Sequence, residues 1–173
     1  MIPQYSSALL ISDLHLTPSM PLTAQRFFDF CEKDAPKVEA VFILGDLFEY
    51  WIGDDAANTS PFQQEVRRAL SNLSTKVATF YIHGNRDFLV GADFLKKTDM
   101  TLLSDPAQIE IAGTPYLLSH GDALCTADVG YQVFRTWVRK PWLQKLFLRL
   151  PLNWRKSIAK QLRSNSHMQG QSA

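Results

Sequence analysis

The sequence has 173 residues, of which 46% are hydrophobic and 20% are charged, a composition that excludes a disordered chain, a collagen and a coiled coil. This length suits one globular domain of about 100–200 residues with a core of its own. The formal net charge of +1 hides two unlike parts, because residues 1–128 carry 9 basic and 17 acidic side chains whereas residues 129–173 carry 9 basic and no acidic ones.

Short apolar runs rich in β-branched and aromatic residues recur along the acidic part of the chain. Each is too short for a typical helix, so we predict buried strands at residues 8–11, 38–44, 77–82 and 116–118. Helical patterns lie between them, over residues 22–31 and, opened by Pro61, over residues 62–73. The alternation of strands and helices predicts an α/β fold.

A β-hairpin is predicted near the end of the acidic part. Residues 109–111 and 116–118 flank a turn that contains Gly113, so the two segments should pair antiparallel. An antiparallel pair does not continue the earlier strand–helix–strand pattern. The core is therefore expected to be a mixed sheet or two packed sheets.

Tryptophans and basic residues interleave after Tyr131, and Pro141 and Pro151 divide this segment into short helices. Further upstream, the run from Ala8 to Ile11 is followed by Asp13 and is too short for a signal peptide, and no run reaches the roughly 18 apolar residues of a membrane span. We therefore expect a cytoplasmic protein. Its two cysteines, at positions 31 and 125, form no Cys-x-x-Cys pair, should stay reduced and are not expected to act as nucleophiles.

Polar side chains that can bind metal ions follow each of the four predicted strands. They are Asp13 and His15, Asp46, Asn85, and His120. Because ligands of α/β sheets bind beyond the carboxyl ends of the strands, these side chains are expected to converge. Carboxylate, amide and imidazole groups without a thiolate favour Mn²⁺, Fe²⁺ or Zn²⁺ over Ca²⁺ or a structural zinc, and one bridging carboxylate can hold two ions.

Each of these short motifs has a second interpretation when taken alone. Asp-x-His and Gly-Asp also cap helices and turns, so the metal hypothesis depends on four motifs following four strands. His83 precedes the Gly-Asn turn and, by strand alternation from Ile82, should point away from it. We expect His83 to be a hydrogen-bonded structural residue.

The sequence resembles the calcineurin-like metallophosphoesterases through four motifs, which are Asp13-Leu14-His15, Gly45-Asp46, Gly84-Asn85-Arg86-Asp87 and His120-Gly121-Asp122. The longer segments 45–55, 83–89 and 120–126 are similar to the pyrophosphatases of that superfamily that hydrolyse UDP-2,3-diacylglucosamine in lipid A biosynthesis. The similarity continues to about Ser166. It implies an α/β, β-sandwich core flanked by helices over residues 1–128, a basic and aromatic helical lid over 129–166, and a frayed tail over 167–173.

The same resemblance implies the roles of the site residues. Asp13 and His15 would bind one ion, Asn85 and His120 a second, and Asp46 would bridge them, with two Mn²⁺ expected and Zn²⁺ or Fe²⁺ ranked lower. The implied reaction is hydrolysis of the pyrophosphate to UMP and 2,3-diacylglucosamine 1-phosphate by a water that bridges the metals, without a separate acid or base. The substrate-binding set would be Asn85, Arg86, Asp128 and Ser166.

Arg86 stands where many metallophosphoesterases have a histidine that donates a proton. A guanidinium stays charged and is a poor proton donor, but it can clamp phosphate oxygens bidentately. A leaving group that is itself a phosphate, with a second pKa of about 6, can depart without receiving a proton. An arginine at this position therefore favours pyrophosphate cleavage. The alternative role for Arg86 is a structural one, in which it only forms an ion pair with Asp87.

The basic segment has three interpretations. It can bind nucleic acid, although no recognised module accompanies it; it can be ordinary helix core; or it can lie on an anionic membrane. Because the implied substrate is diacylated, we favour membrane contact among the three. This implies a peripheral protein of the inner membrane. Its contacts with acyl chains or with the bilayer would come from Leu143, Leu146, Phe147 and Leu150.

The family pattern also has a late Gly-His-x-His motif, which the sequence lacks. The resemblance thus implies a C-terminally incomplete member, with an under-coordinated first metal and without the closing strands of the second sheet. Two alternatives to the pyrophosphatase stay open. One is another dinuclear phosphodiesterase, and the other is an inactive remnant that binds membrane or nucleic acid.

Overall fold

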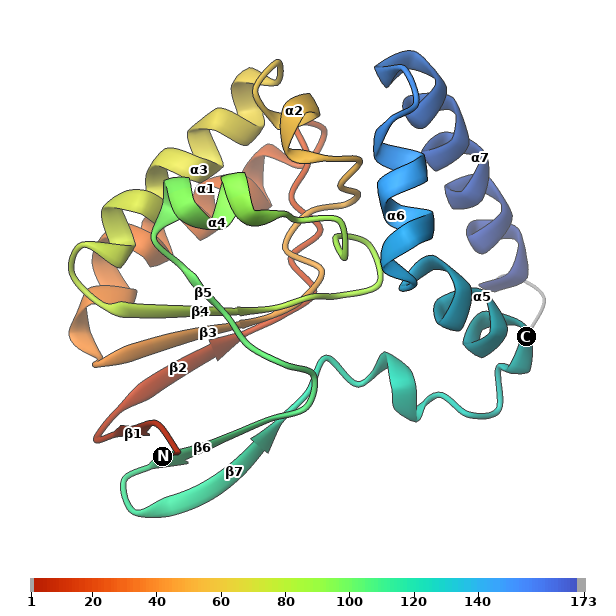
Figure 1. Cartoon of the computed structure of the whole chain (residues 1–173). Coiled ribbons are helices and arrows are strands. Elements are labelled where there is room, and N and C mark those ends of the chain that lie inside the picture. The colour runs from red at the N-terminus through yellow and green to blue at the C-terminus, as the bar shows by residue number, and fades with distance from the viewer. Residues whose placement is uncertain (1, 171–173) are drawn as a thin grey trace. The chain divides into compact units, whose positions relative to one another are not determined.

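The computed structural model describes the backbone of residues 2–170 and the side chains of residues 2–162. The chain divides into two compact units, Met1–Ala127 and Asp128–Ala173. Figure 1 shows strands and helices in the first unit and helices in the second.

The first unit contains a four-stranded parallel sheet in the order β2-β3-β4-β5. Its strands are β2 (Ala8–Ile11), β3 (Ala40–Leu44), β4 (Ala78–Ile82) and β5 (Thr101–Leu102). Helices connect successive strands and cover one face of the sheet (Figure 1). They are α1 (Pro21–Asp29) with its continuations η1 (Phe30–Asp34) and η2 (Ala35–Lys37), then α2 (Asp54–Ala57), α3 (Pro61–Ser74) and α4 (Ala92–Thr98).

A three-stranded sheet, β1-β6-β7, packs on the other face of the parallel sheet (Figure 1). Its strands are β1 (Gln4–Tyr5), β6 (Ala107–Ile111) and β7 (Thr114–Leu118). Phe42 and Ile82 from one sheet and Ile109 and Leu118 from the other form one buried cluster, which is the core between the sheets. The two-sheet α/β architecture flanked by helices is therefore confirmed.

Helix α3 has the capping residue, the proline and the apolar face that predict a helix from sequence. The Ser60 side chain caps it by accepting a 3.3 Å hydrogen bond from the backbone N–H of Gln63, and Pro61 occupies its first turn. Val66, Leu70 and Leu73 are its buried residues, at the spacing of one helical face.

The predicted hairpin is also confirmed. Strands β6 and β7 pair antiparallel, with Ile111 opposite Thr114. The two loop residues, Ala112 and Gly113, both have positive φ, at 50° and 79°. Positive φ at both positions is the geometry of the tight turns whose twist matches that of paired strands.

The second unit consists of α5 (Val129–Val138), α6 (Pro141–Leu148) and α7 (Leu152–Gly170), so the two prolines do separate helices. No residue of α5 or α6, all of which are described, is buried. Several large apolar side chains are exposed here, among them Val133, Trp137, Trp142, Leu146 and Trp154. Within the part of the chain that the structure describes, no helix is long and apolar enough to cross a bilayer.

The sequence prediction missed the shortest elements of the fold. Strands β1 and β5 have two residues each, and α2 has four, so none shows a periodic pattern. The helix expected over residues 22–31 begins at Pro21 and continues from Phe30 as a π-helix. Residues 171–173 of the expected tail lie outside the described residues.

Candidate metal centre

The loops that follow β2 and β3 run side by side and carry three of the predicted ligands. Backbone N–H groups of Asp13 and His15 donate to the carbonyls of Gly45 and Asp46, at 3.2 and 2.9 Å. Asp13, His15 and Asp46 have φ of 54°, 47° and 51°, in the left-handed region that side chains other than glycine seldom adopt. Strained backbone of this kind, repeated at three neighbouring polar residues, is typical of a functional site.

The first group of candidate ligands is formed by Asp13, His15 and Asp46. One donor atom from each lies within 4.8 Å of the others. His15 Nε2 is 3.8 Å from Asp46 Oδ2, and Asp46 is buried whereas Asp13 is exposed. Two carboxylates and an imidazole at this spacing form a donor set that suits a divalent transition metal.

The second group is formed by Asn85, His120 and the same Asp46. His120 Nδ1 lies 2.8 Å from the carbonyl oxygen of Leu44, so Nδ1 carries the proton and Nε2 presents its lone pair to the other side. This Nε2 is 3.8 Å from Asp46 Oδ1 and 3.0 Å from the Asn85 amide. Metal-binding histidines are commonly oriented by such a hydrogen bond from their other nitrogen.

The Asn85 amide has one terminal atom surrounded by acceptors. That atom lies 2.7 and 3.1 Å from the two Asp46 oxygens and 3.0 Å from His120 Nε2. Without a cation, the amide nitrogen must occupy the position and donate to them, whereas the amide oxygen would occupy it only beside a cation. Three acceptors that meet in this way fit a metal site.

Two glycines allow the loops to approach this closely. A Cβ at Gly84 would overlap the carboxylate and the backbone nitrogen of Asp46. A Cβ at Gly45, where φ is 84°, would lie 2.8 Å from His120 Nδ1. The Gly-Asp and Gly-Asn pairs of the sequence therefore have a steric reason at this point.

Asp87 fastens the loops after β3 and β4 to one another. It is fully buried, and its carboxylate accepts hydrogen bonds from the backbone N–H groups of Asp46, Leu47, Phe48 and Gly84, at 2.7–3.3 Å. Asp87 thereby fixes the backbone on which Asp46 stands.

With this geometry in view, the comparisons with known proteins decide the family. The profile of the calcineurin-like phosphoesterases matches residues 7–167. The chain belongs to the calcineurin-like phosphoesterase family. Its group of carboxylate, amide and imidazole side chains at the strand ends is therefore a candidate for the metal centre of a phosphoesterase, and the resemblance drawn from the four motifs is confirmed.

Three curated relatives of this phosphoesterase are named UDP-2,3-diacylglucosamine hydrolase. The protein from Aeromonas hydrophila is 49% identical over 94% of this chain and 67% of its own length. The protein from Coxiella burnetii is 46% identical over 91% of this chain and 64% of its own length. The protein from Escherichia coli is 48% identical over 92% of this chain and 66% of its own length. The chain therefore spans about two thirds of the length of the relatives it matches.

A solved structure, that of the Pseudomonas putida nuclease MPE, also resembles this phosphoesterase. The two sequences are 20% identical and the TM-score is 0.44. The aligned region covers 57% of this chain and 48% of the nuclease chain.

The carboxylate of Asp46, which lies beside both His15 and His120, has an electrostatic environment that suits a cation. Burial raises the pKa of its carboxyl group, and the negative charge of Asp87 acts in the same direction. A 2.8 Å hydrogen bond from the backbone N–H of Arg86 and the nearby imidazoles of His120 and His15 lower the pKa in opposition. The neighbours of this buried carboxylate compensate its negative charge only in part. A bound divalent ion would therefore stabilise it.

The remaining predicted site residues have different surroundings. Within the described residues, no ion pair joins the Arg86 guanidinium to Asp87, and both Asp87 oxygens accept hydrogen bonds from backbone N–H groups instead. Asp128 caps α5, with its carboxylate accepting a 2.9 Å bond from the N–H of Tyr131. The side chain of Ser166 lies outside the described residues.

Two of the expectations for other residues are confirmed. His83 Nε2 is 2.8 Å from the carbonyl oxygen of Val90 and is thus a structural histidine. Burial raises the pKa of the Cys31 thiol to about 12, so this cysteine is protonated and unreactive at neutral pH.

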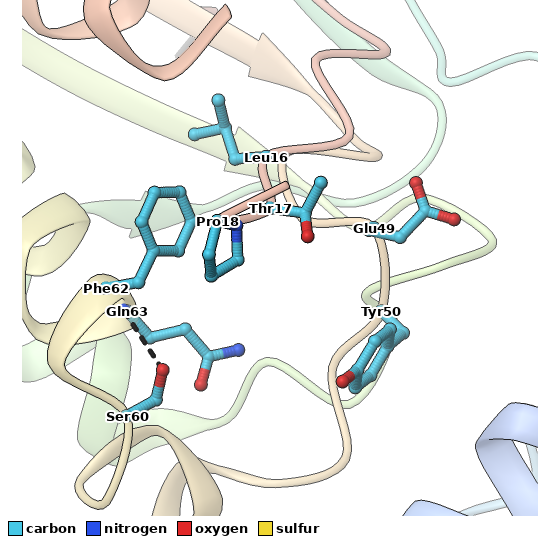
Figure 2. Close-up of a pocket in the computed structure, with 8 residues that line it drawn as sticks. All are labelled: Leu16, Thr17, Pro18, Glu49, Tyr50, Ser60, Phe62 and Gln63. Atoms are coloured by element: carbon cyan, nitrogen blue, oxygen red, sulfur yellow. Dashed lines mark hydrogen bonds between the residues drawn. The ribbon is translucent and has the colours of Figure 1, made fainter. Parts of the chain in front are cut away.

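A small pocket is lined in part by the residues that directly follow His15 in the chain (Figure 2). Its volume is about 50 Å³, and its lining residues are Leu16, Thr17, Pro18, Glu49, Tyr50, Ser60, Phe62 and Gln63. Since one water needs roughly 10–15 Å³ of such volume, the pocket has room for a few waters but not for a nucleotide.

Proposed function

We propose that this chain uses its candidate metal centre to hydrolyse the pyrophosphate bond of UDP-2,3-diacylglucosamine. The products would be UMP and 2,3-diacylglucosamine 1-phosphate, as in lipid A biosynthesis. The observation that carries the proposal is that two groups of ligands share Asp46 at the strand ends, in a chain whose relatives are named hydrolases of this compound.

The donor set fits two divalent ions, and we propose Mn²⁺ for both. Asp13 and His15 would hold one ion, Asn85 and His120 the other, and Asp46 both. When bound, such a pair of ions supplies a nucleophilic water at neutral pH and neutralises charge on the attacked phosphate. The protein's own part is to hold the His120 ring through Leu44 and to hold Asp46 through Asp87.

Arg86 is proposed to clamp the phosphate. Its backbone N–H is bonded to Asp46, which anchors the residue beside the metal ligands, and its side chain is only partly buried. Because Asp87 does not pair with it, the guanidinium keeps its donors for phosphate oxygens. An arginine here gives no proton to the leaving group, which suits a phosphate leaving group. Asn85, Asp128 and Ser166 are proposed as further substrate contacts.

The second unit is proposed to bind the cytoplasmic surface of an anionic membrane. Residues 129–173 carry 9 basic side chains and no acidic ones, and tryptophans 137, 142 and 154 are at least half exposed. Basic helices with exposed tryptophans bind headgroups through charge and the acyl boundary through their apolar side chains. A diacylated substrate resides at such a surface.

Release of UMP tests the proposal. We expect Mn²⁺-dependent UMP release by the full chain from UDP-2,3-diacylglucosamine in mixed micelles. Asp46→Ala should abolish turnover and reduce the number of Mn²⁺ ions retained in equilibrium dialysis, because this carboxylate belongs to both groups of ligands. Asp34→Ala, which removes an exposed carboxylate, is the matched control and should leave both unchanged.

Two results would contradict the proposal. Hydrolysis of a soluble phosphodiester with the lipid substrate untouched would favour a different phosphodiesterase. Mn²⁺ binding without any turnover, together with salt-sensitive binding to liposomes or DNA, would favour an inactive binding protein.

A further inference from the structure

His15 stands between two carboxylates. Its Nε2 faces Asp46 Oδ2 at 3.8 Å, and its Nδ1 faces Glu49 Oε2 at 3.9 Å. Although a third of the ring is exposed, the Nδ1 atom is buried and forms no hydrogen bond with any described residue. A buried ring nitrogen without a hydrogen bond costs free energy, so the native environment is expected to supply a partner.

The backbone brings Glu49 to this position. Leu16 and Phe48 form a parallel β-bridge, in which the N–H of Leu16 donates to Leu47 at 2.8 Å and the N–H of Glu49 donates to Leu16 at 3.3 Å. The residue after His15 is therefore paired with the residue before Glu49. The side chains of His15 and Glu49 thus extend from two loops that are hydrogen-bonded to each other. This pairing of the loops sets the distance between the two side chains.

The Glu49 side chain lines the small pocket, and one of its carboxylate oxygens faces the His15 ring. This side chain is only 13% exposed. Figure 2 shows the carboxylate pointing away from Ser60 and Gln63, which line the far side of the pocket. Glu49 cannot share the ion of His15 Nε2, because it faces the opposite nitrogen of the same ring.

His120 in the second group shows what such a partner does. Its Nδ1 donates to the Leu44 carbonyl at 2.8 Å, which leaves Nε2 as the nitrogen that faces Asp46. His15 presents the same nitrogen to Asp46 but has a carboxylate where His120 has a carbonyl. A carboxylate partner fixes the tautomer and also makes the ring a stronger donor to a metal.

Building on the metal centre of the proposed function, we propose that Glu49 is a positioning residue that accepts the Nδ1 proton of His15 and thereby holds Nε2 toward the first ion. A movement of about 1 Å in the Glu49 side chain brings the two atoms to the 2.7–3.2 Å of a hydrogen bond. Glu49 acts through His15 and touches neither ion nor substrate. No signal in the sequence marked it, although it follows the Gly-Asp motif by three residues.

The test measures both metal affinity and the protonation of the ring. The probe is Zn²⁺, which is diamagnetic, and the variants of the full chain are Glu49→Ala and Glu49→Gln. We expect Glu49→Ala to weaken the first Zn²⁺ site by about 10–100-fold, the usual effect of removing a histidine's partner, and to leave the site of Asn85 and His120 unchanged. Glu49→Gln keeps an acceptor oxygen, so we expect it to restore most of the affinity.

The ¹⁵N chemical shift of the His15 ring reports its tautomer directly. In the Zn²⁺-loaded wild type, Nδ1 should be protonated and Nε2 should carry the metal, and in Glu49→Ala this preference should weaken. Glu65→Gln, an exposed glutamate of α3, is the matched control and should change neither readout.

The outcomes separate this inference from the proposed function. A wild type that binds no Zn²⁺ would contradict the metal centre itself. A wild type that binds Zn²⁺, with an equal first-site affinity in Glu49→Ala or an unprotonated His15 Nδ1, would overturn the role of Glu49 alone. If Glu49→Ala does not fold, the wild-type spectrum and the Glu49→Gln affinity still decide the question.

Discussion

The three residues of the first ligand group combine chemical use with backbone strain. A left-handed backbone costs a residue with a side chain about 1–2 kcal/mol relative to a right-handed one, with aspartate among the residues that tolerate it best. Asp13, His15 and Asp46 all adopt it, and two of them place negative charge within 4.8 Å of one another. The metal-free site is therefore destabilised at the places where an ion would bind.

Asp13→Gly tests this strain. Glycine adopts positive φ freely, and the change also removes one of two neighbouring carboxylates, although glycine gains entropy in the unfolded chain. We expect the free energy of unfolding of the metal-free protein to stay level or rise by about 1 kcal/mol. The first ion should be lost. Urea unfolding in chelator gives the stability, and equilibrium dialysis with Mn²⁺ gives the number of ions.

Asp99→Gly is the matched control for this substitution. Asp99 ends α4 with a φ of 53°, close to the 54° of Asp13, and it lies in neither ligand group. The control should gain stability in the same way without any change in Mn²⁺ binding. A large loss of stability in Asp13→Gly alone would show that Asp13 is structural and not strained for function.

At the scale of elements, the metal centre depends on how the strand-end loops are joined. The loop after β3 contributes three N–H groups to Asp87, and the loop after β4 contributes that of Gly84. These bonds link segments about forty residues apart in sequence through one buried carboxylate. Asp87 thus determines the relative position of Asp46 and Asn85, which the two ligand groups require.

Asp87→Asn should therefore disturb the fold and the site together. The amide keeps one acceptor oxygen, but its NH₂ group would face backbone N–H groups that donate to the carboxylate in the wild type, which leaves buried donors unsatisfied. We expect a loss of about 2–4 kcal/mol in the free energy of unfolding, together with weaker Mn²⁺ binding. Asp93→Asn breaks an exposed i,i+4 pair with Lys97 and should have little effect. Unchanged unfolding of Asp87→Asn in urea would refute the role given to Asp87.

The contrast between Asp46 and Asp87 shows what could be predicted from the sequence. Strand β3 is an apolar run with four of its five residues buried, and β4 is rich in aromatic and β-branched residues, so the ends of both strands, and with them Asp46 and Asn85, were predictable. The partners of Asp87 are backbone groups, which no side-chain pattern reveals. The same holds for Glu49, because its distance from His15 depends on a β-bridge between two loops.

At the scale of the molecule, opposite charges are separated along the chain. Residues 1–128, with 17 acidic side chains, contain the candidate metal ligands, and residues 129–173 contain 9 basic side chains. Because an anionic surface would repel the acidic part, attraction of the chain to such a surface would come from the basic unit. Lys140 lies 4.1 Å above the Trp137 ring, so charge and aromatic surface are already associated within that unit.

Binding to vesicles should follow from this separation. We expect the full chain to sediment with vesicles that contain phosphatidylglycerol, and the bound fraction to fall as salt rises from low to high concentration, since each basic residue near such a surface contributes about 1 kcal/mol. Replacing Trp142 and Trp154 by alanine should weaken binding at every salt concentration, because their exposed rings are the apolar part of the contact. Leu22→Ala is the matched control, since Leu22 is 79% exposed in the acidic part and should not matter. Equal binding to neutral and anionic vesicles, or a preference for DNA over both, would show that the basic unit does not recognise an anionic membrane.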